Sequence, residues 1–227
     1  MKRLLCAGWV GLLVSQGWVF AEPAELPPLP KLDQPAEAPE AEPATRVSAP
    51  PEVIAAAVDA VARLGNEVVM GRFTAAIEQM NPQWKERTAL RLGGMDVLER
   101  QLQGVADQMV QQGISMIKFT PHAPKASFEV APGKSMETVN GQVVEKLIFH
   151  KWLVLVPTTT KFRIIRPDDA KPIFIDSTGF QVAVADKGKN NWSFIDGAGI
   201  SVSELRSLYP TLPQDLELPP TEKKESR

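Results

Sequence analysis

The feature that most constrains the fold is a change in the hydrophobic pattern near residue 114. Before this point apolar residues recur every three or four positions, and after it short apolar runs are separated by turn residues. The first pattern is typical of amphipathic helices and the second of β-strands. Because the helices come first and the strands follow as a block, the order predicts an α+β fold with helices packed on one side of an antiparallel sheet.

Three helical segments are predicted in the first block. An apolar stripe over residues 54–80 slips by one position midway, which predicts a bend at Gly65 or Gly71. A shorter amphipathic segment covers 84–92. The clearest stripe, over 95–109, repeats at steps of three and four.

The second block predicts strands and one last helix. Asn140-Gly141 is typical of a two-residue hairpin turn. The segment 143–156 is apolar on both faces, which predicts a central strand, with a bulge or corner at Pro157. Ser201-x-x-Glu204 is a capping box that predicts a short closing helix. The other strands are predicted over 115–120, 126–130, 136–139, 158–166, 174–186 and 192–196, with a turn at 167–169.

This order of elements, with one C-terminal motif, resembles a known family. Residues 191–197 (Asn-Trp-Ser-Phe-Ile-Asp-Gly), followed by Leu-Arg-Ser-Leu-Tyr-Pro over 205–210, are similar to the end of uncharacterised bacterial secreted proteins of the NTF2-like superfamily. The resemblance covers roughly residues 52–213. It implies a strongly curved sheet that forms a cone around a pocket. Isomerases of that superfamily pair an acidic base with a tyrosine, but here the single tyrosine, Tyr209, follows the last strand, so no catalytic residue is implied.

The first 21 residues have the three parts of a secretory signal peptide. A basic start, Met1-Lys2-Arg3, precedes an apolar stretch over 4–20, and small residues precede Glu22. We expect cleavage after Ala21 and a periplasmic or secreted protein without stable membrane insertion. The alternative is an uncleaved anchor, because the apolar stretch approaches spanning length. Cleavage would remove Cys6, the single cysteine.

Residues 22–51 have the composition of a disordered Pro/Ala/Glu-rich linker. They hold nine of the 20 prolines, and six acidic against two basic residues give them a charge of −4. Such a segment cannot bury enough apolar surface to fold, so we expect an extended spacer. We also expect a polar C-terminal tail over 214–227, which leaves 52–213 as the folded domain.

Composition and motifs exclude several classes of function. The net charge of −2 gives no reason to expect a nucleic-acid partner. One cysteine and two histidines leave little for a transition-metal site. Residues 131–135 (Ala-Pro-Gly-Lys-Ser) lack the leading glycine of a phosphate loop, because position 128 is phenylalanine. We therefore expect no metal and no cofactor.

Four residues are candidates for lining a pocket: His150, Trp152, Asp176 and Phe180. His150 and Trp152 share a predicted apolar strand face, where a histidine can carry protons near neutral pH. The alternative for His150 is a half-buried side chain with one hydrogen-bond partner. Asp176 shares a face with Phe180 and would act as a base if buried, whereas at a strand end it would be solvated.

Three functions remain open at this point. The leading one is an exported non-enzymatic domain that binds a protein partner or a small apolar ligand. The second is a pocket enzyme of isomerase, dehydratase or hydrolase type that uses Asp176 and His150. The third is an envelope-associated structural module tethered by the linker. A homodimer through the sheet is also expected, because 143–156 is apolar on both faces and helices cover only one.

Overall fold

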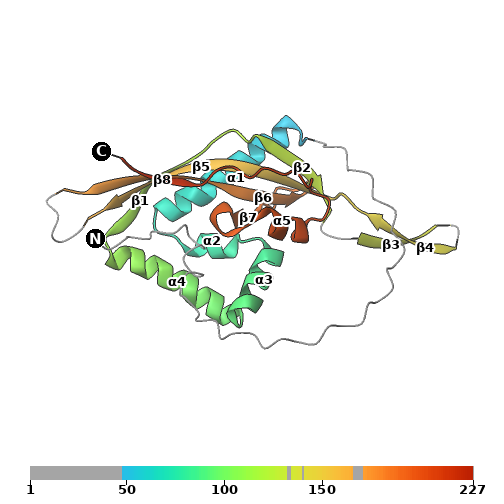
Figure 1. Ribbon diagram of the computed structural model, residues 1–227, viewed down its shortest axis with the longest axis horizontal. Helices are drawn as coiled ribbons and strands as arrows, with labels where there is room; N and C mark the ends of the chain where they lie inside the picture. Colours follow the sequence, from blue (N-terminus) through green and yellow to red (C-terminus); the bar gives the residue numbers. More distant parts are fainter. Residues whose placement is uncertain (1–47, 132–133, 140, 166–170, 227) are drawn as a thin grey trace, which may run out of the picture.

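The computed structural model describes residues 48–131, 134–139, 141–165 and 171–226. Its helices pack against an open, six-stranded antiparallel sheet (Figure 1). The α+β class predicted from the order of the elements is therefore confirmed. The signal-peptide segment, most of the predicted linker and the predicted turn at 167–169 lie outside the described residues.

Two long central strands, β5 and β6, pair along their whole length and organise the sheet. Each central strand carries two shorter strands on its outer side. β1 and β2 share the outer edge of β5, and β8 and β7 share that of β6. The bounds are β1 (Ile114–Pro121), β2 (Ala126–Val130), β5 (Lys151–Ile164), β6 (Ile173–Asp186), β7 (Ser193–Asp196) and β8 (Glu222–Ser226).

Pro157 lies inside β5 without interrupting it. Its partner on β6 is Phe180, in an unbroken register. On the other side, the pairing of β5 changes from β1 at Thr158 to β2 at Leu155. The Pro157 carbonyl accepts a hydrogen bond from the His122 N–H at 2.8 Å on this side. A proline is tolerated here because its missing N–H faces the gap between two edge strands, so the predicted bulge is wrong.

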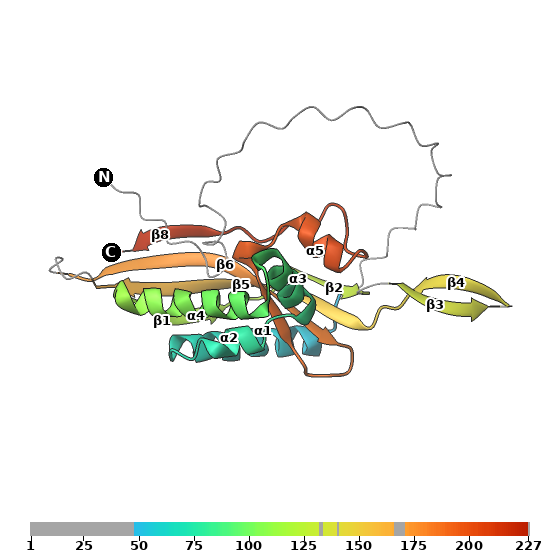
Figure 2. The same cartoon turned by 90° about the horizontal axis from the view of Figure 1, so that it is seen from below.

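The helices divide between the two faces of the sheet, so the prediction that they pack on one side is wrong for the closing helix, α5. Figure 2 shows α1, α2 and α4 against one face and α5 on the opposite side. The bent helix predicted over 54–80 is instead two separate helices, and Gly71 lies between them with a φ of +80°, a value that glycine adopts easily. The predicted capping box at the start of α5 is confirmed. The bounds are α1 (Pro51–Val69), α2 (Thr74–Glu78), α3 (Pro82–Leu92), α4 (Met95–Gln111) and α5 (Val202–Leu208).

Both faces of the first half of β5 are buried. Val154 and Val156 pack with residues of α1, in one cluster. Leu153 and Leu155 point the other way and pack with Leu205 of α5 in a second cluster. Burial on both sides explains why the sequence is apolar on both faces. The face of β5 that was expected to be free for a homodimer is therefore covered by α5 and the segment after it.

The single long strand predicted over 143–156 is also wrong. Residues 142–147 form β4 (Gln142–Leu147), which pairs with β3 (Lys134–Val139) in a separate hairpin that projects from the body (Figures 1 and 2). The break has a clear cause. Val130 of β2 and Asp186 of β6 both pair with Lys151, so both neighbours of β5 end there and nothing would pair with a longer strand. The predicted hairpin itself is confirmed, although Asn140 lies outside the described residues.

The folded region extends beyond the predicted limits of 52–213 at both ends. The Ala49 N–H donates to the Ser127 hydroxyl of β2 at 2.9 Å, and α1 begins at Pro51, where the fixed φ of proline suits a first helical turn. After residue 213, Leu216 is buried and the expected polar tail forms β8. A strand can form from polar residues here because its hydrogen bonds to β6 are made by the backbone, and charged side chains are normal on an edge strand.

Candidate functional site

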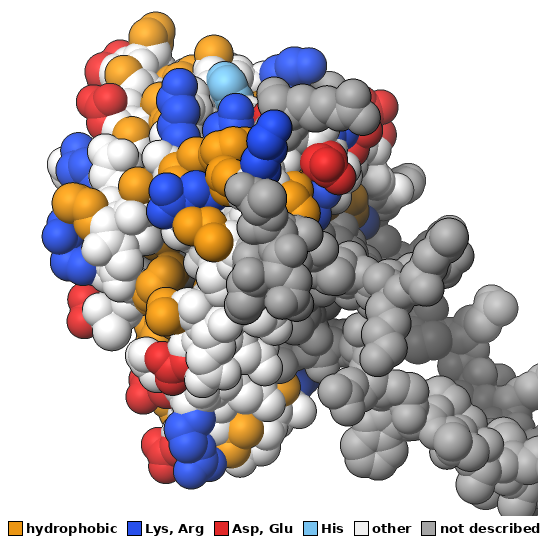
Figure 3. All heavy atoms as spheres, turned by 90° about the vertical axis from the view of Figure 1, so that its left-hand side faces the viewer, with side chains coloured by type: hydrophobic (Ala, Val, Ile, Leu, Met, Phe, Trp, Pro, Cys, Tyr) orange, Lys and Arg blue, Asp and Glu red, His pale blue; other side chains and the backbone are white. Residues whose placement is uncertain are grey.

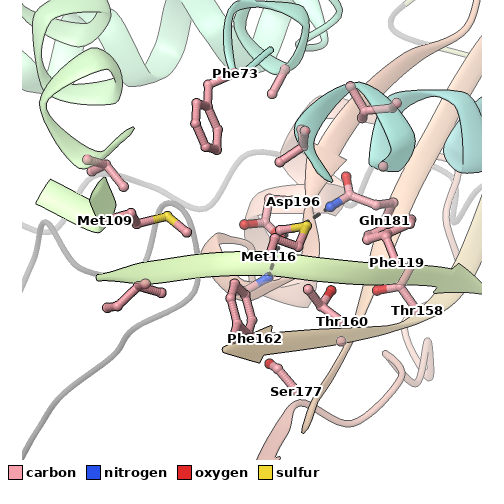
Figure 4. A pocket seen from close by; sticks show the side chains of 18 of the residues that line it. Phe73, Met109, Met116, Phe119, Thr158, Thr160, Phe162, Ser177, Gln181 and Asp196 are labelled. Carbon is pink, nitrogen blue, oxygen red and sulfur yellow. Dashed lines mark hydrogen bonds between the residues drawn. The ribbon is translucent and has the colours of Figure 1, made fainter. Parts of the chain in front are cut away.

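A cavity of about 610 Å³ lies between helices α1, α2 and α4 and the half of the sheet that carries β1 and β8. This volume is within the range of small-molecule sites in proteins. Figure 4 shows that labelled side chains from the strands and helices point into it. The lining is mostly apolar and includes Phe73, Ile77, Leu102, Val105, Met109, Ile114, Met116, Phe119, Phe162, Ile164, Ile175 and Phe194.

The floor of the cavity exists because the central strands change side-chain size along their length. In the first half of β5, Val154 and Val156 contact α1 directly. In the second half, the same face carries Thr158 and Thr160, which pair with Gly179 and Ser177 of β6. These side chains are small, so they leave space under the helices where the first half leaves none.

A glycine in α1 shapes one wall. A Cβ atom added to Gly65 would lie 1.9 Å from the ring of Phe119, far closer than any real contact. Glycine therefore lets the Phe119 ring lie directly against the helix while the ring still lines the cavity.

Figure 3 shows the outer surface of the domain from the left-hand side of Figure 1. Hydrophobic side chains on this surface are surrounded by Lys and Arg side chains.

The polar corner of the cavity is formed by Asp196, Gln181 and Lys223. Asp196 is the last residue of β7 and caps a 3₁₀ turn, η2 (Gly197–Gly199). Its Oδ1 accepts hydrogen bonds from the Ala198 N–H at 3.3 Å and from the Gln181 amide at 3.4 Å (Figure 4). All three corner side chains belong to residues that line the cavity.

Burial in this corner raises the pKa of the Asp196 carboxyl above its ordinary value of 3.8. The Ala198 N–H and the positive charge of Lys223 offset part of this effect. A carboxylate that is desolvated without a full set of partners costs stability. A buried carboxyl with a shifted pKa inside a cavity is a feature of binding and catalytic sites.

The four residues singled out from the sequence do not lie together. Phe180 is 3% exposed and lines the cavity. His150 is exposed, lies before β5, and has its Nδ1 3.0 Å from the carbonyl oxygen of Ile148. Trp152 lies under the ammonium of Lys187, 4.9 Å from its ring centroid. Asp176 is half-exposed beside Lys161, at 3.7 Å.

Asp176 and His150 are also too far apart to act together. His150 directly precedes Lys151 at the start of β5, whereas Asp176 pairs with Lys161, ten positions further along the strand. His150 is thus eleven positions from the partner of Asp176, which at about 3.4 Å per residue separates the two by roughly 37 Å. The sheet register therefore contradicts the hypothesis of an enzyme that uses Asp176 and His150 together. In addition, neither residue lines the cavity.

Asp196 and Lys223 were not among the residues predicted from the sequence to line a pocket. Asp196 begins an Asp-Gly-Ala-Gly run that has the composition of a turn, and Lys223 falls in the segment expected to be a polar tail. The available signal was the position of a carboxylate directly after the buried strand residues Phe194 and Ile195. That signal does not reveal that β8 brings a lysine to the same place.

We expect Asp196→Asn to raise the free energy of unfolding at pH 7 by about 1 kcal/mol, a typical size for one substitution. Because the folded-state pKa of Asp196 is raised, its charge destabilises the fold at neutral pH. The wild type should therefore gain stability relative to the variant as the pH falls towards about 4, near the unfolded pKa. Urea unfolding across this pH range measures the difference.

The matched control for this substitution is Asp176→Asn, on the outer half of β6. Asp176 is half-exposed and its ion pair with Lys161 is of a kind worth little in water. This variant should be no more stable than the wild type at any pH. A neutral-pH loss of stability in Asp196→Asn, as large as about 1 kcal/mol, would contradict the assignment of a net burial cost to Asp196.

Comparisons with protein-family models, with curated proteins and with solved structures find no match for this chain. Among the described residues, no group of three or more His, Cys, Asp or Glu side chains could hold a metal ion. Within those same ranges, no helix has the length and apolar character needed to cross a membrane.

Proposed function

We propose that this domain binds a small apolar molecule in the cavity between its sheet and helices α1, α2 and α4. The observation that carries the proposal is the cavity itself, with a volume of about 610 Å³ and a mostly apolar lining. Atoms that line an apolar cavity of this size have fewer packing partners than atoms of a filled core. A ligand that fills it would recover those contacts.

A small molecule is favoured over a protein partner as the occupant. The lining comes from the inner faces of packed elements, namely three helices and the strands below them. A protein segment would have to enter between these layers, whereas a compact ligand needs only the existing space. The proposed function is therefore ligand binding rather than protein docking.

We further propose that the domain is NTF2-like and acts after export. Support for the architecture comes from the position of the cavity between an antiparallel sheet and N-terminal helices. Support for export comes from the signal-like residues 1–21 and the Pro-rich segment that follows them. N-terminal sequencing of the purified periplasmic or secreted form should then begin at Glu22.

The test of ligand binding uses N-phenyl-1-naphthylamine, an apolar dye whose fluorescence rises in apolar surroundings. We expect saturable binding to the wild type and at least about tenfold weaker binding to Thr160→Phe. Thr160 lies on the floor of the cavity (Figure 4), so the larger ring occupies the space of the ligand. Fluorescence titration at constant protein concentration measures both affinities.

The control is the neighbouring substitution Thr159→Phe. Thr159 points to the opposite face of β5, where its hydroxyl lies 2.8 Å from Nε2 of His122, and it does not line the cavity. The same ring added there should leave dye binding unchanged. Equal dye affinity in Thr160→Phe and the wild type would refute the cavity as the binding site.

A further inference from the structure

The cavity has a defined polar corner, and its chemistry indicates the class of ligand. Building on the proposed ligand-binding function, we infer that the domain selects an uncharged amphiphile, an apolar molecule with one hydroxyl group, and holds that hydroxyl between Asp196, Gln181 and Lys223. The apolar part of the ligand then lies under α2 and α4, against Phe73, Met109 and Phe162.

The first observation is that the corner lies at one edge of β6. Asp196 of β7 pairs with Gln181, and Lys223 of β8 pairs with Ser177, on the same edge of β6. Gly179 lies between these two pairs and has no partner in either strand. The polar groups therefore flank an interruption of the sheet edge, and the cavity extends into it.

The second step concerns charge. The corner contains one acidic and one basic side chain, and the positive charge of Lys223 acts directly on the Asp196 carboxyl. An anionic head group would meet the like charge of Asp196 as well as the opposite charge of Lys223, and a cationic one the reverse, so neither gains a net attraction that offsets the cost of its desolvation. A hydroxyl avoids this cost because it donates one hydrogen bond and accepts others.

The third step concerns the hydrogen bonds that the corner offers. The carboxylate of Asp196 is a charged acceptor, and hydrogen bonds to charged groups are stronger than those between neutral groups. The ammonium of Lys223 and the amide of Gln181 are donors. A ligand hydroxyl placed among them can donate to the first and accept from either of the others.

The experiment compares three ligands with the same eight-carbon chain: 1-octanol, octanoate and octylammonium, each displacing N-phenyl-1-naphthylamine at pH 7.5. We expect octanol to bind at least about tenfold more tightly than either ion, since desolvating a charge beside a like charge opposes binding. Tighter binding of octanoate or of octylammonium would overturn the inference and assign a charged head group to the corner.

Two variants locate the effect. Asp196→Asn keeps the size of the side chain but removes the charged acceptor, so octanol affinity should fall about fivefold, with the dye affinity of the same variant measured alongside. Asp176→Asn, a carboxylate outside the cavity, should change neither. Unchanged octanol affinity in Asp196→Asn would overturn the assignment of the corner.

The failure of this inference is distinguishable from the failure of the proposed function. If the dye does not bind the wild type, or binds Thr160→Phe equally well, the cavity is not a ligand site. If the dye binds and is blocked by Thr160→Phe, but the three ligands bind with equal affinity, then the cavity binds apolar chains and the polar corner selects nothing.

Discussion

Gly113→Ala should lower the free energy of unfolding by about 4 kcal/mol, near the upper end for a single substitution. Gly113 joins α4 to β1 with a φ of +65°, in the left-handed region that penalises other residues by about 1–2 kcal/mol. An added Cβ would also lie 2.1 Å from the carbonyl oxygen of Ile165. Because that oxygen belongs to the backbone, the clash can be relieved only if the chain moves at Ile165. The Ile165 N–H donates to the Gly113 carbonyl at 3.0 Å, so this movement would disturb that hydrogen bond.

Gly71→Ala is the matched control for this prediction. Its φ of +80° carries the same conformational penalty, but nothing lies within 4 Å of the position of an added Cβ. We expect a loss of only about 1–2 kcal/mol, from backbone conformation alone. Urea unfolding of both variants measures the difference, and equal losses would show that the approach to Ile165 adds nothing.

Asn81→Ala should cost about 3 kcal/mol of unfolding free energy, through several hydrogen bonds lost at once. The Asn81 side chain is 4% exposed and caps α3 by accepting from the Trp84 N–H at 3.2 Å. Its amide donates to the hydroxyls of Tyr209 at 3.1 Å and Ser193 at 3.2 Å. Alanine removes the cap and leaves the buried Tyr209 hydroxyl without this donor.

This prediction depends on a neutral Tyr209 in the interior. Burial raises the pKa of Tyr209 to about 12, so its hydroxyl keeps its proton throughout the ordinary pH range. The control is Asn190→Ala, at an exposed position between β6 and β7, which should change stability by less than about 0.5 kcal/mol. A loss as small as this in Asn81→Ala would contradict the role of Asn81 in joining α3, β7 and the segment after α5.

Only some of the interactions of Asn81 can be predicted from the neighbouring sequence. Asn81-Pro82 is a clear signal for a helix boundary, since asparagine is a preferred cap and proline a preferred first residue. The same dipeptide does not reveal that its amide donates across 128 residues to Tyr209. Cap chemistry depends on neighbours in the chain, whereas the second partner depends on how α5 packs.

The candidate site shows the same division. Phe180 was a pocket candidate because it lies in a long apolar strand, and it does line the cavity. His150 and Asp176 were candidates for the same reason. However, His150 lies outside the sheet, one residue before β5 begins, and Asp176 is half-exposed beside Lys161. Strand alternation gives two faces without saying which one is covered at each end.

The α+β class, the hairpin, the capping box and the positions of most helices follow from the amino-acid sequence alone, because each depends on side-chain periodicity or on turn and cap chemistry within a few residues. The start of β5 at Lys151, the edge strand over 222–226 and the cavity above the small side chains of Thr160 and Ser177 could be seen only in the folded molecule. These outcomes depend on which distant segments pair and pack. The polar corner is the clearest case, since Asp196 and Lys223 meet only because β7 and β8 share one edge of β6.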